Sequence, residues 1–308
     1  MASLREIRRK MRAIRATRQV TKAMELVAAS KMRRATQSAV TLRHYALSAW
    51  NLLEHIADVH PDIHPYLMKR SGEKTLALLF MSDRGLCGSL NALMFRTVLK
   101  YIKEVTSLPS FETLHFVAVG KKAQQILARN HQTVIAAFSA LSNHPTFRDV
   151  LPMTTIATES FLQGTYDHIV LIYPDFVSAL VQEPVVKVLL PFSKTDLKEM
   201  IGSLLPRKRG SEQRAASSSQ QAAVNEYLFE PSPEDIVRTI LPQLTEIQLY
   251  QAVLEAAASE HSARMVAMHN ATDNASDFLS DLTLTFNQTR QANITAELAE
   301  LSASSAAL

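Results

Sequence analysis

A spacing of four and three residues runs through the first 60 positions and predicts one long helix with a single buried face. Its main series comprises Met24, Ala28, Lys31, Ala35, Ser38, Leu42, Tyr45, Ala49, Leu52 and Ile56. An earlier series, Leu4, Ile7, Met11 and Ile14, has the same spacing but is out of step with it. We therefore predict one heptad slip near Arg18 to Thr21. Pro61 and Pro65 end the predicted helix.

A second long series of the same spacing fills the last part of the chain. Ser232, Pro233 and Asp235 form a helix start, with a capping side chain followed by proline at the first helical position. Pro242 predicts a kink or a short separate first piece. Many residues of the series are small or polar, which indicates close approach and contact with more than one partner. The series comprises Ile240, Leu244, Ile247, Gln251, Leu254, Ala258, His261, Met265, Met268, Thr272, Ala275, Leu279, Leu282 and Phe286.

Short apolar runs alternate with helical patterns between these two segments, which is typical of an α/β sheet that is at least partly parallel. The predicted strands are Thr75–Met81, Thr113–Val119, Thr133–Phe138, His168–Tyr173 and Val185–Pro191. The predicted helices are Leu90–Val105, Lys121–Arg129, Phe147–Phe161 and Thr195–Leu204. We therefore predict a coiled-coil helix over 1–60, a Rossmann-like α/β domain over 72–206, a linker over 207–230 and a second coiled-coil helix over 231–308.

Glycine and proline are absent from residues 1–60 and from residues 243–308. Because these two residue types most strongly interrupt helices, each end could form a rod of roughly 90 Å. Charge suggests how the two rods are arranged: residues 1–43 carry a net charge of +10, and residues 243–308 carry −6. Opposite charge and matching apolar faces predict that the two ends pair side by side and antiparallel.

Candidate chemistry is sparse. The Ser82–Asn91 segment follows a predicted strand and holds two glycines, but it lacks the spacing of a phosphate-binding loop and is interpreted as a tight turn. Cys87 is the only cysteine, so it excludes an internal disulfide and favours a reducing compartment. His55, His60 and His64 match no strong metal signature. We single out no catalytic, cofactor-binding or metal-ligating residue, and no run of eighteen apolar residues exists.

Two functions of other kinds remain open at this point. The basic first helix could bind nucleic acid through phosphates, although no base-reading module follows it. The chain could equally be a non-rotary coiled-coil adaptor. A nucleic-acid binder would not explain the acidic helix of similar length at the other end, whereas pairing of the two helices does.

Five segments together resemble the γ subunit of bacterial F-type ATP synthases, in a somewhat divergent form. They cover essentially the whole chain in order: Ile14–Arg34, Ser82–Asn91, Tyr227–Ser232, Ala258–Ala275, and Arg290–Ala292 with Ile294 and Thr295. The resemblance implies a single-copy central rotor shaft whose paired terminal helices turn inside a ring of α and β subunits. It also implies that the α/β domain forms a foot on the ε subunit and the c-ring.

The resemblance further implies a non-catalytic subunit of a proton-translocating synthase, with Na⁺ as the alternative ion. The subunit would be peripheral, on the cytoplasmic face of the bacterial plasma membrane, with no cofactor and no nucleic acid. The residues that would engage the catalytic ring are Met24, Arg264, Arg290, Gln291 and Thr295. We expect Arg264→Ala to impair coupling while leaving assembly intact.

One departure from the family falls beside these residues. The family usually has Tyr-Asn-basic-Ala-Arg where this chain has Phe286-Asn287-Gln288-Thr289-Arg290. One phenolic hydroxyl and one positive charge are therefore missing at the level that would face the ring.

Overall fold

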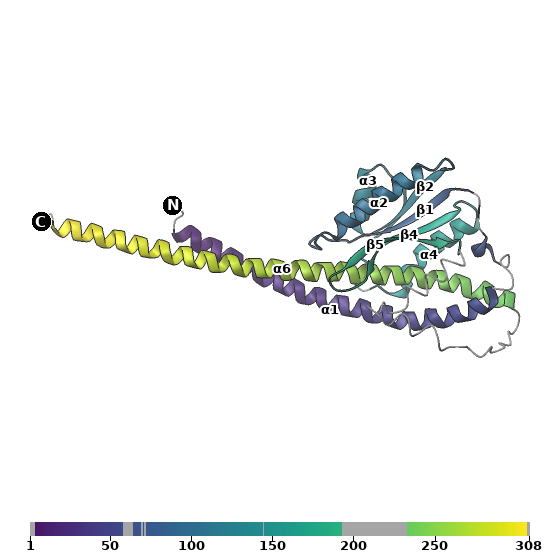
Figure 1. Ribbon diagram of the computed structural model, residues 1–308, viewed down its shortest axis with the longest axis horizontal. Helices are drawn as coiled ribbons and strands as arrows, with labels where there is room; N and C mark the ends of the chain where they lie inside the picture. Colours follow the sequence, from purple (N-terminus) through teal and green to yellow (C-terminus); the bar gives the residue numbers. More distant parts are fainter. Residues whose placement is uncertain are drawn as a thin grey trace, which may run out of the picture.

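Two long helices and one sheet make up the fold in the computed structural model, which describes residues 4–57, 64–68, 70, 72–143, 145–192 and 233–306. Helix α1 spans Leu4–Ala57 and helix α6 spans Pro233–Ala306. They lie side by side and antiparallel, with the α/β domain packed against one end of the pair (Figure 1). A short 3-10 turn, η1 (Pro65–Leu67), precedes the sheet. The predicted helix Thr195–Leu204 and the predicted linker 207–230 lie outside the described residues.

The sheet has five strands in the order β3-β2-β1-β4-β5. Strands β1 to β4 are parallel, and β5 pairs antiparallel with β4. This confirms the α/β class with a Rossmann-like middle. The strands are β1 (Lys74–Phe80), β2 (Thr113–Val119), β3 (Val134–Phe138), β4 (His168–Phe176) and β5 (Gln182–Leu190).

Helices cover both faces of the sheet. Helices α2 (Leu90–Thr106) and α3 (Lys121–Arg129) bury Met94 and Leu127 against one face. Helix α4 (Phe147–Leu162) and the first part of α6 cover the other face. Strand β1 lies in the middle, and its residues from Thr75 to Phe80 are all buried.

The first part of α6 belongs to the core of the α/β domain. Leu241, Leu244 and Val253 are buried in the same cluster as the residues of β4 and α4. The helix also runs without interruption through Pro242, so the expected short separate first piece is wrong. A proline in the interior of a helix removes one backbone hydrogen bond. The buried Leu241 and Leu244 beside Pro242 offset that loss.

The seam between α1 and α6, meaning the side chains that each buries against the other, uses small residues at its middle. Ala35 packs on Ala257 and Ala258, and Phe176 of β4 packs on the same cluster. Close by, Ser259 Oγ donates to the carbonyl of Pro174, 3.0 Å away. The expectation that this part of α6 faces more than one partner is confirmed, because α6 contacts both α1 and the sheet here.

The expected heptad slip in α1 is wrong. Burial repeats every seven residues, with Ile7, Ile14, Thr21, Ala28 and Ala35 all buried or partly buried. The register stays continuous because Thr21, which is polar in the sequence, is buried and accepts a hydrogen bond of 2.8 Å from the hydroxyl of Thr272 on α6. A polar residue at a seam position had concealed the repeat.

Helix α6 extends well beyond the first residue of α1. Ile7 and Met11 pack on Leu279, and the guanidinium of Arg8 lies 5.4 Å from the centre of the Phe286 ring. The remaining part of α6, up to Ala306, projects as one unaccompanied helix (Figure 1). Twenty residues of helix correspond to roughly 30 Å.

Candidate functional site

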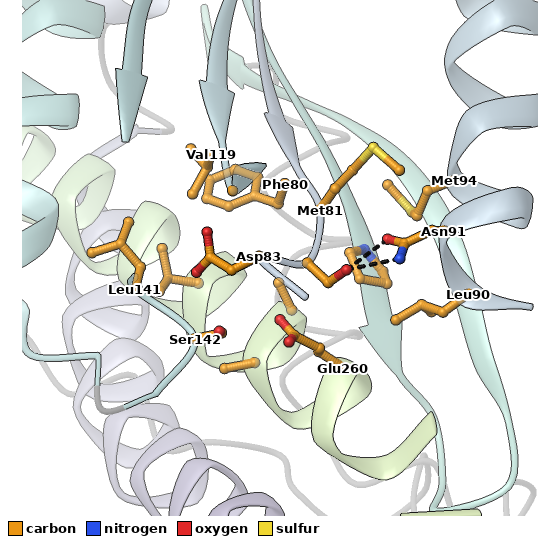
Figure 2. Close-up of a pocket in the computed structure, with 16 residues that line it drawn as sticks. Phe80, Met81, Asp83, Leu90, Asn91, Met94, Val119, Leu141, Ser142 and Glu260 are labelled. Carbon is orange, nitrogen blue, oxygen red and sulfur yellow. Dashed lines mark hydrogen bonds between the residues drawn. The ribbon is translucent and has the colours of Figure 1, made fainter. Parts of the chain in front are cut away.

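The turn after β1 is held by its own side chains. Ser82 Oγ lies 3.0 Å from Asn91 Oδ1 and 2.7 Å from Asn91 Nδ2, as the dashed lines at Asn91 mark in Figure 2. Asn91 Nδ2 also lies 3.1 Å from Cys87 Sγ, and Cys87 is buried. Leu86 and Gly88 have positive φ angles of 64° and 58°. The interpretation of this segment as a tight turn is therefore confirmed, and Cys87 packs inside it.

Asp83 fixes this turn to the neighbouring loops of the sheet. Its carboxylate accepts a hydrogen bond of 3.1 Å from the backbone N–H of Lys121 and one of 2.8 Å from that of Ala140. Asp83, Ser142 and Glu260 line one small cavity of ≈ 30 Å³ (Figure 2). The carboxyl ends of β1, β2 and β3 thus meet α6 at this point.

A buried charged cluster joins α6 to the turn. Arg264 Nη2 lies 2.7 Å from Glu260 Oε1, and Glu260 and Arg264 are only 4% and 8% exposed. The same guanidinium nitrogen donates to the carbonyls of Arg84 at 3.4 Å and Gly85 at 3.3 Å. We call Glu260, His261, Arg264 and these two carbonyls the joint cluster. It neutralises a buried cation and ties the coiled coil to the α/β domain.

Burial shifts the acid–base behaviour of the joint cluster. It lowers the pKa of His261 to about 4, and the nearby Arg264 charge also lowers it. The ring is therefore neutral near pH 7, and its Nε2 lies 2.7 Å from the carbonyl oxygen of Ser142. Burial raises the pKa of Glu260, while Arg264 acts in the opposite direction. His261 is thus a buried, hydrogen-bonded residue of the seam series.

A groove of ≈ 410 Å³ runs between α1, the turn after β1 and α6. Met24 and Arg264 both line it, so the structure brings together two of the residues expected to engage a ring. Apolar side chains at its rim are largely exposed: Val20 is 58%, Val27 55% and Leu86 62% exposed. The groove thus combines an apolar rim with the edge of a neutralised cation, a composition suited to contact with another polypeptide.

The other three expected residues lie elsewhere. Arg290, Gln291 and Thr295 are exposed on the projecting part of α6. The hydroxyl of Thr295 donates to the carbonyl of Gln291 at 2.9 Å. The 26 residues of helix between Arg264 and Arg290 correspond to roughly 40 Å, so these residues form a second, distal site.

Sequence reasoning missed the acidic partners buried in α6. Glu260 appeared only as part of a matched segment, and Glu255 was not singled out. Glu255 is buried, with Gln251 Nε2 2.8 Å from its Oε1, and its burial beside Asp175 raises its pKa to about 7. The sequence did contain a signal for their burial, because both glutamates lie within an apolar stretch of an otherwise acidic helix.

The described residues offer little for metal binding or membrane crossing. Among them no group of three or more His, Cys, Asp or Glu could hold a metal ion. His64 Nδ1 accepts a hydrogen bond from the backbone N–H of Tyr66, and His60 lies outside the described part. In that same part, no helix combines the length and the apolar character that a membrane span requires.

Comparison with known proteins decides the family. The ATP synthase family matches residues 3–308. A chain named ATP synthase gamma chain from Roseiflexus sp. (strain RS-1) is 40% identical over 311 residues, covering 100% of this chain and 99% of the relative. The chain belongs to the ATP synthase gamma chain family. The gamma chain of Opitutus terrae is also 40% identical, over 305 residues and 98% of each chain.

Solved structures share the fold. A chain from the Euglena gracilis mitochondrial ATP synthase, in an OSCP/F1/c-ring structure, superposes with a TM-score of 0.62 at 21% identity. The match covers 99% of this gamma chain and 94% of that chain. A chain from the central stalk and c-ring structure of Tetrahymena thermophila gives a TM-score of 0.55 at 23% identity, with 82% and 99% covered.

Proposed function

We propose that this gamma chain is the central rotor shaft of an F-type ATP synthase and is not catalytic on its own. The observation that carries the proposal is the asymmetric rod: a two-helix coil anchored in an α/β domain at one end and a single exposed helix at the other. A rod of this shape presents different side chains to each of several equivalent neighbours. As the rod turns, each neighbour would meet a different set of side chains and adopt a different conformation. Because each conformation has its own affinity for nucleotide, rotation would be coupled to nucleotide affinity.

The proposed contacts with a ring of α and β subunits lie at two levels. The lower level is the groove with Met24 and Arg264, and the upper level is the distal site with Arg290, Gln291 and Thr295. Exposure at the upper level and an apolar rim at the lower level support these contacts. The α/β domain lies at the opposite end from the tip and would bind the ε subunit and the c-ring.

The proposed setting is the cytoplasmic face of the bacterial plasma membrane, where the chain would be a peripheral subunit present in one copy. Protons are the proposed coupling ion, with Na⁺ as the alternative. Ion selection in this proposal belongs to other subunits. Neither a cofactor nor a nucleic acid is required.

Reconstitution tests the rotor proposal. The isolated chain is expected to show no ATP hydrolysis, and mixing it with cognate α and β subunits is expected to restore hydrolysis. A bead attached to the α/β domain should rotate during that hydrolysis. Failure to co-purify with α and β, together with tight DNA binding that weakens strongly with salt, would instead support a nucleic-acid binder.

Arg290→Ala is expected to reduce coupled ATP synthesis about tenfold. A hydrogen bond to a charged group is worth about 1.5–3 kcal/mol, and each 1.4 kcal/mol corresponds to a factor of ten. The measurement is proton-driven ATP synthesis in reconstituted vesicles. Asp281→Asn, which also removes one charge from an exposed side chain of the same helix, is the matched control. Equal synthesis rates in the Arg290→Ala variant and the wild type would remove Arg290 from the proposed contact.

A further inference from the structure

Helix α1 is held on the rod mainly by its contacts with α6. Beside the α/β domain, α6 lies between α1 and the sheet (Figure 1), and it is the element against which α1 packs most extensively. A hydrogen bond of 2.8 Å joins Lys31 Nζ to Asn143 Oδ1 in the α/β domain, but it is exposed. The position of α1 along the rod therefore depends on how its seam side chains fit those of α6.

The apolar side chains of the seam fix that position only weakly. Helix α1 buries alanine at two positions seven residues apart, Ala28 and Ala35. Sliding α1 by one heptad therefore places one alanine where the other had been. Nearer the tip, Ile7 and Met11 pack on Leu279, and apolar contacts of this kind are not directional. Such packing favours pairing of the two helices without selecting one register among several.

A buried polar pair, Thr21 with Thr272, distinguishes one register from the next. Thr21 is only 9% exposed, and the two Oγ1 atoms lie 2.8 Å apart across the seam. A shift of one heptad would place Ile14 or Ala28 opposite Thr272. The cross-helix hydrogen bond is therefore possible in the observed register and in neither of these shifted ones. A single polar residue at a seam position specifies the register of coiled coils in the same way.

The hydroxyl protons of this pair all have acceptors. Thr21 Oγ1 also lies 3.0 Å from the carbonyl oxygen of Arg18, and Thr272 Oγ1 lies 2.7 Å from that of Met268. Each hydroxyl has one proton, so one threonine donates across the seam while the other donates within its own helix. Loss of the cross-helix bond would leave each proton with a carbonyl acceptor in its own helix. The pair can thus select a register while contributing little to the free energy of unfolding.

The register decides which residues of α1 and α6 meet at the groove of the lower contact level. Met24 and Arg264, which both line that groove, lie three and eight residues from the threonine of their own helix. Between the threonines and the groove, Glu25 Oε1 lies 3.3 Å from His269 Nδ1, a contact that needs the same register. Displacement of α1 by seven residues would move Met24 about 10 Å along α6 and separate it from Arg264.

We propose that Thr21 and Thr272 are positioning residues that set the axial register of α1 on α6, and with it the height of Met24 beside Arg264. The register is a property of the isolated chain, and only its effect on coupling rests on the proposed rotor function. A seam held by apolar packing alone could slide under load, because neighbouring registers bury similar side chains. The polar pair opposes such sliding.

The first test measures the distance between spin labels on the two helices by double electron–electron resonance. The labels are attached to Arg9→Cys and Asn270→Cys, both at exposed positions, in a chain that also carries Cys87→Ser. With both threonines present, one narrow distance is expected. Thr21→Val with Thr272→Val should favour the shifted registers about 2- to 13-fold, the equivalent of one net hydrogen bond. The shifted population would have one label displaced by about 10 Å along the other helix.

Two matched variants separate the hydroxyl groups from general packing. Thr21→Ser with Thr272→Ser keeps both hydroxyl groups and should retain the single distance. Thr17→Val with Thr285→Val removes two exposed hydroxyl groups that bond within their own helices, and should also retain it. Urea midpoints of all these variants are expected to stay near that of the wild type. A lower midpoint for the valine pair at the seam, with an unchanged distance, would overturn the proposal, because the threonines would then be an ordinary packing contact.

The second test moves the polar position of α1 by one heptad. Thr21→Ala with Ala28→Thr places a hydroxyl group opposite Thr272 only after α1 slides by seven residues. This exchange removes one net hydrogen bond from the observed register and adds one to the shifted register. The equilibrium should therefore change about 5- to 160-fold toward a longer distance between the labels. If neither this variant nor the valine pair at the seam shows a displaced population, the two threonines do not set the register.

The effect on coupling is measured separately, in the assembled complex. The valine pair at the seam is expected to lower proton-driven ATP synthesis in reconstituted vesicles in proportion to the displaced population, and the serine pair should keep the wild-type rate. If the label distances respond as expected but synthesis does not, the register is supported and its link to the rotor contact at Met24 is wrong. If the wild-type chain does not assemble with α and β, the rotor function itself is wrong, and the label distances still decide the register.

Discussion

Arg264→Ala is expected to lower the free energy of unfolding of the full chain by about 3–5 kcal/mol, because breaking a buried ion pair leaves an uncompensated charge. Glu260 would stay buried at 4% exposure without its cation. The carbonyls of Arg84 and Gly85 would also lose their donor. Urea unfolding followed by circular dichroism measures the change. Arg290→Ala removes an exposed arginine from the same helix and serves as the control.

A double variant separates the role of Arg264 in stability from a role in contact with the ring. Glu260→Leu with Arg264→Met removes both charges, and such replacements are often neutral or stabilising. It should therefore unfold near the wild-type urea concentration. If its coupled ATP synthesis stays low, Arg264 also contacts the ring, whereas recovery would show that its role is confined to the joint cluster. An unchanged midpoint for Arg264→Ala alone would contradict the buried pair.

Raising the pH from about 4.5 to about 7 is expected to destabilise the chain through Glu255 by about 3 kcal/mol. Burial, reinforced by the charge of Asp175, raises the pKa of Glu255 in the folded state to about 7 from its usual 4.5. The folded state therefore holds this proton more tightly than the unfolded state does. The stabilisation is fully present below pH 4.5, and it is lost as the pH rises through the folded-state pKa.

Glu255→Gln tests this directly. The variant keeps the size and hydrogen-bonding capacity of the side chain but carries no titrating proton, so it should lose this part of the pH dependence. Urea midpoints between pH 4.5 and pH 8 would show the difference widening toward high pH, with the variant more stable. Glu297→Gln changes an exposed carboxyl on the same helix and is the matched control. If the urea midpoints of the wild type and of Glu255→Gln changed with pH in parallel, Glu255 would be excluded as the source of this pH dependence.

The spacing of apolar residues and the positions of glycine and proline were enough to predict the elements of the fold. The absence of glycine and proline indicated two long helices, and the apolar runs located all five strands to within a few residues. Strand β4 continues through Pro174 to Phe176, which the prediction missed because antiparallel pairing with β5 stabilises this extension. Such pairing is a tertiary effect that no local pattern contains.

The candidate site was less accessible to sequence reasoning. Resemblance indicated Met24 and Arg264, and both line one groove. The burial of Arg264 could not be inferred, because it depends on the turn after β1 meeting α6 from a position 180 residues away in the chain. The continuous register through Thr21 was missed for a related reason: its hydrogen bond to Thr272 is visible only once the two helices are aligned.

The unaccompanied end of α6 has a mechanical consequence. Beside the sheet, α6 packs against α1, β4 and α4. Further along it packs against α1 alone, and at the tip it has no neighbouring helix (Figure 1). Cross-section therefore decreases in steps along the rod, and resistance to twisting decreases with it. Under load, elastic deformation should concentrate toward the tip, so the upper contact level would lag in angle behind the lower one.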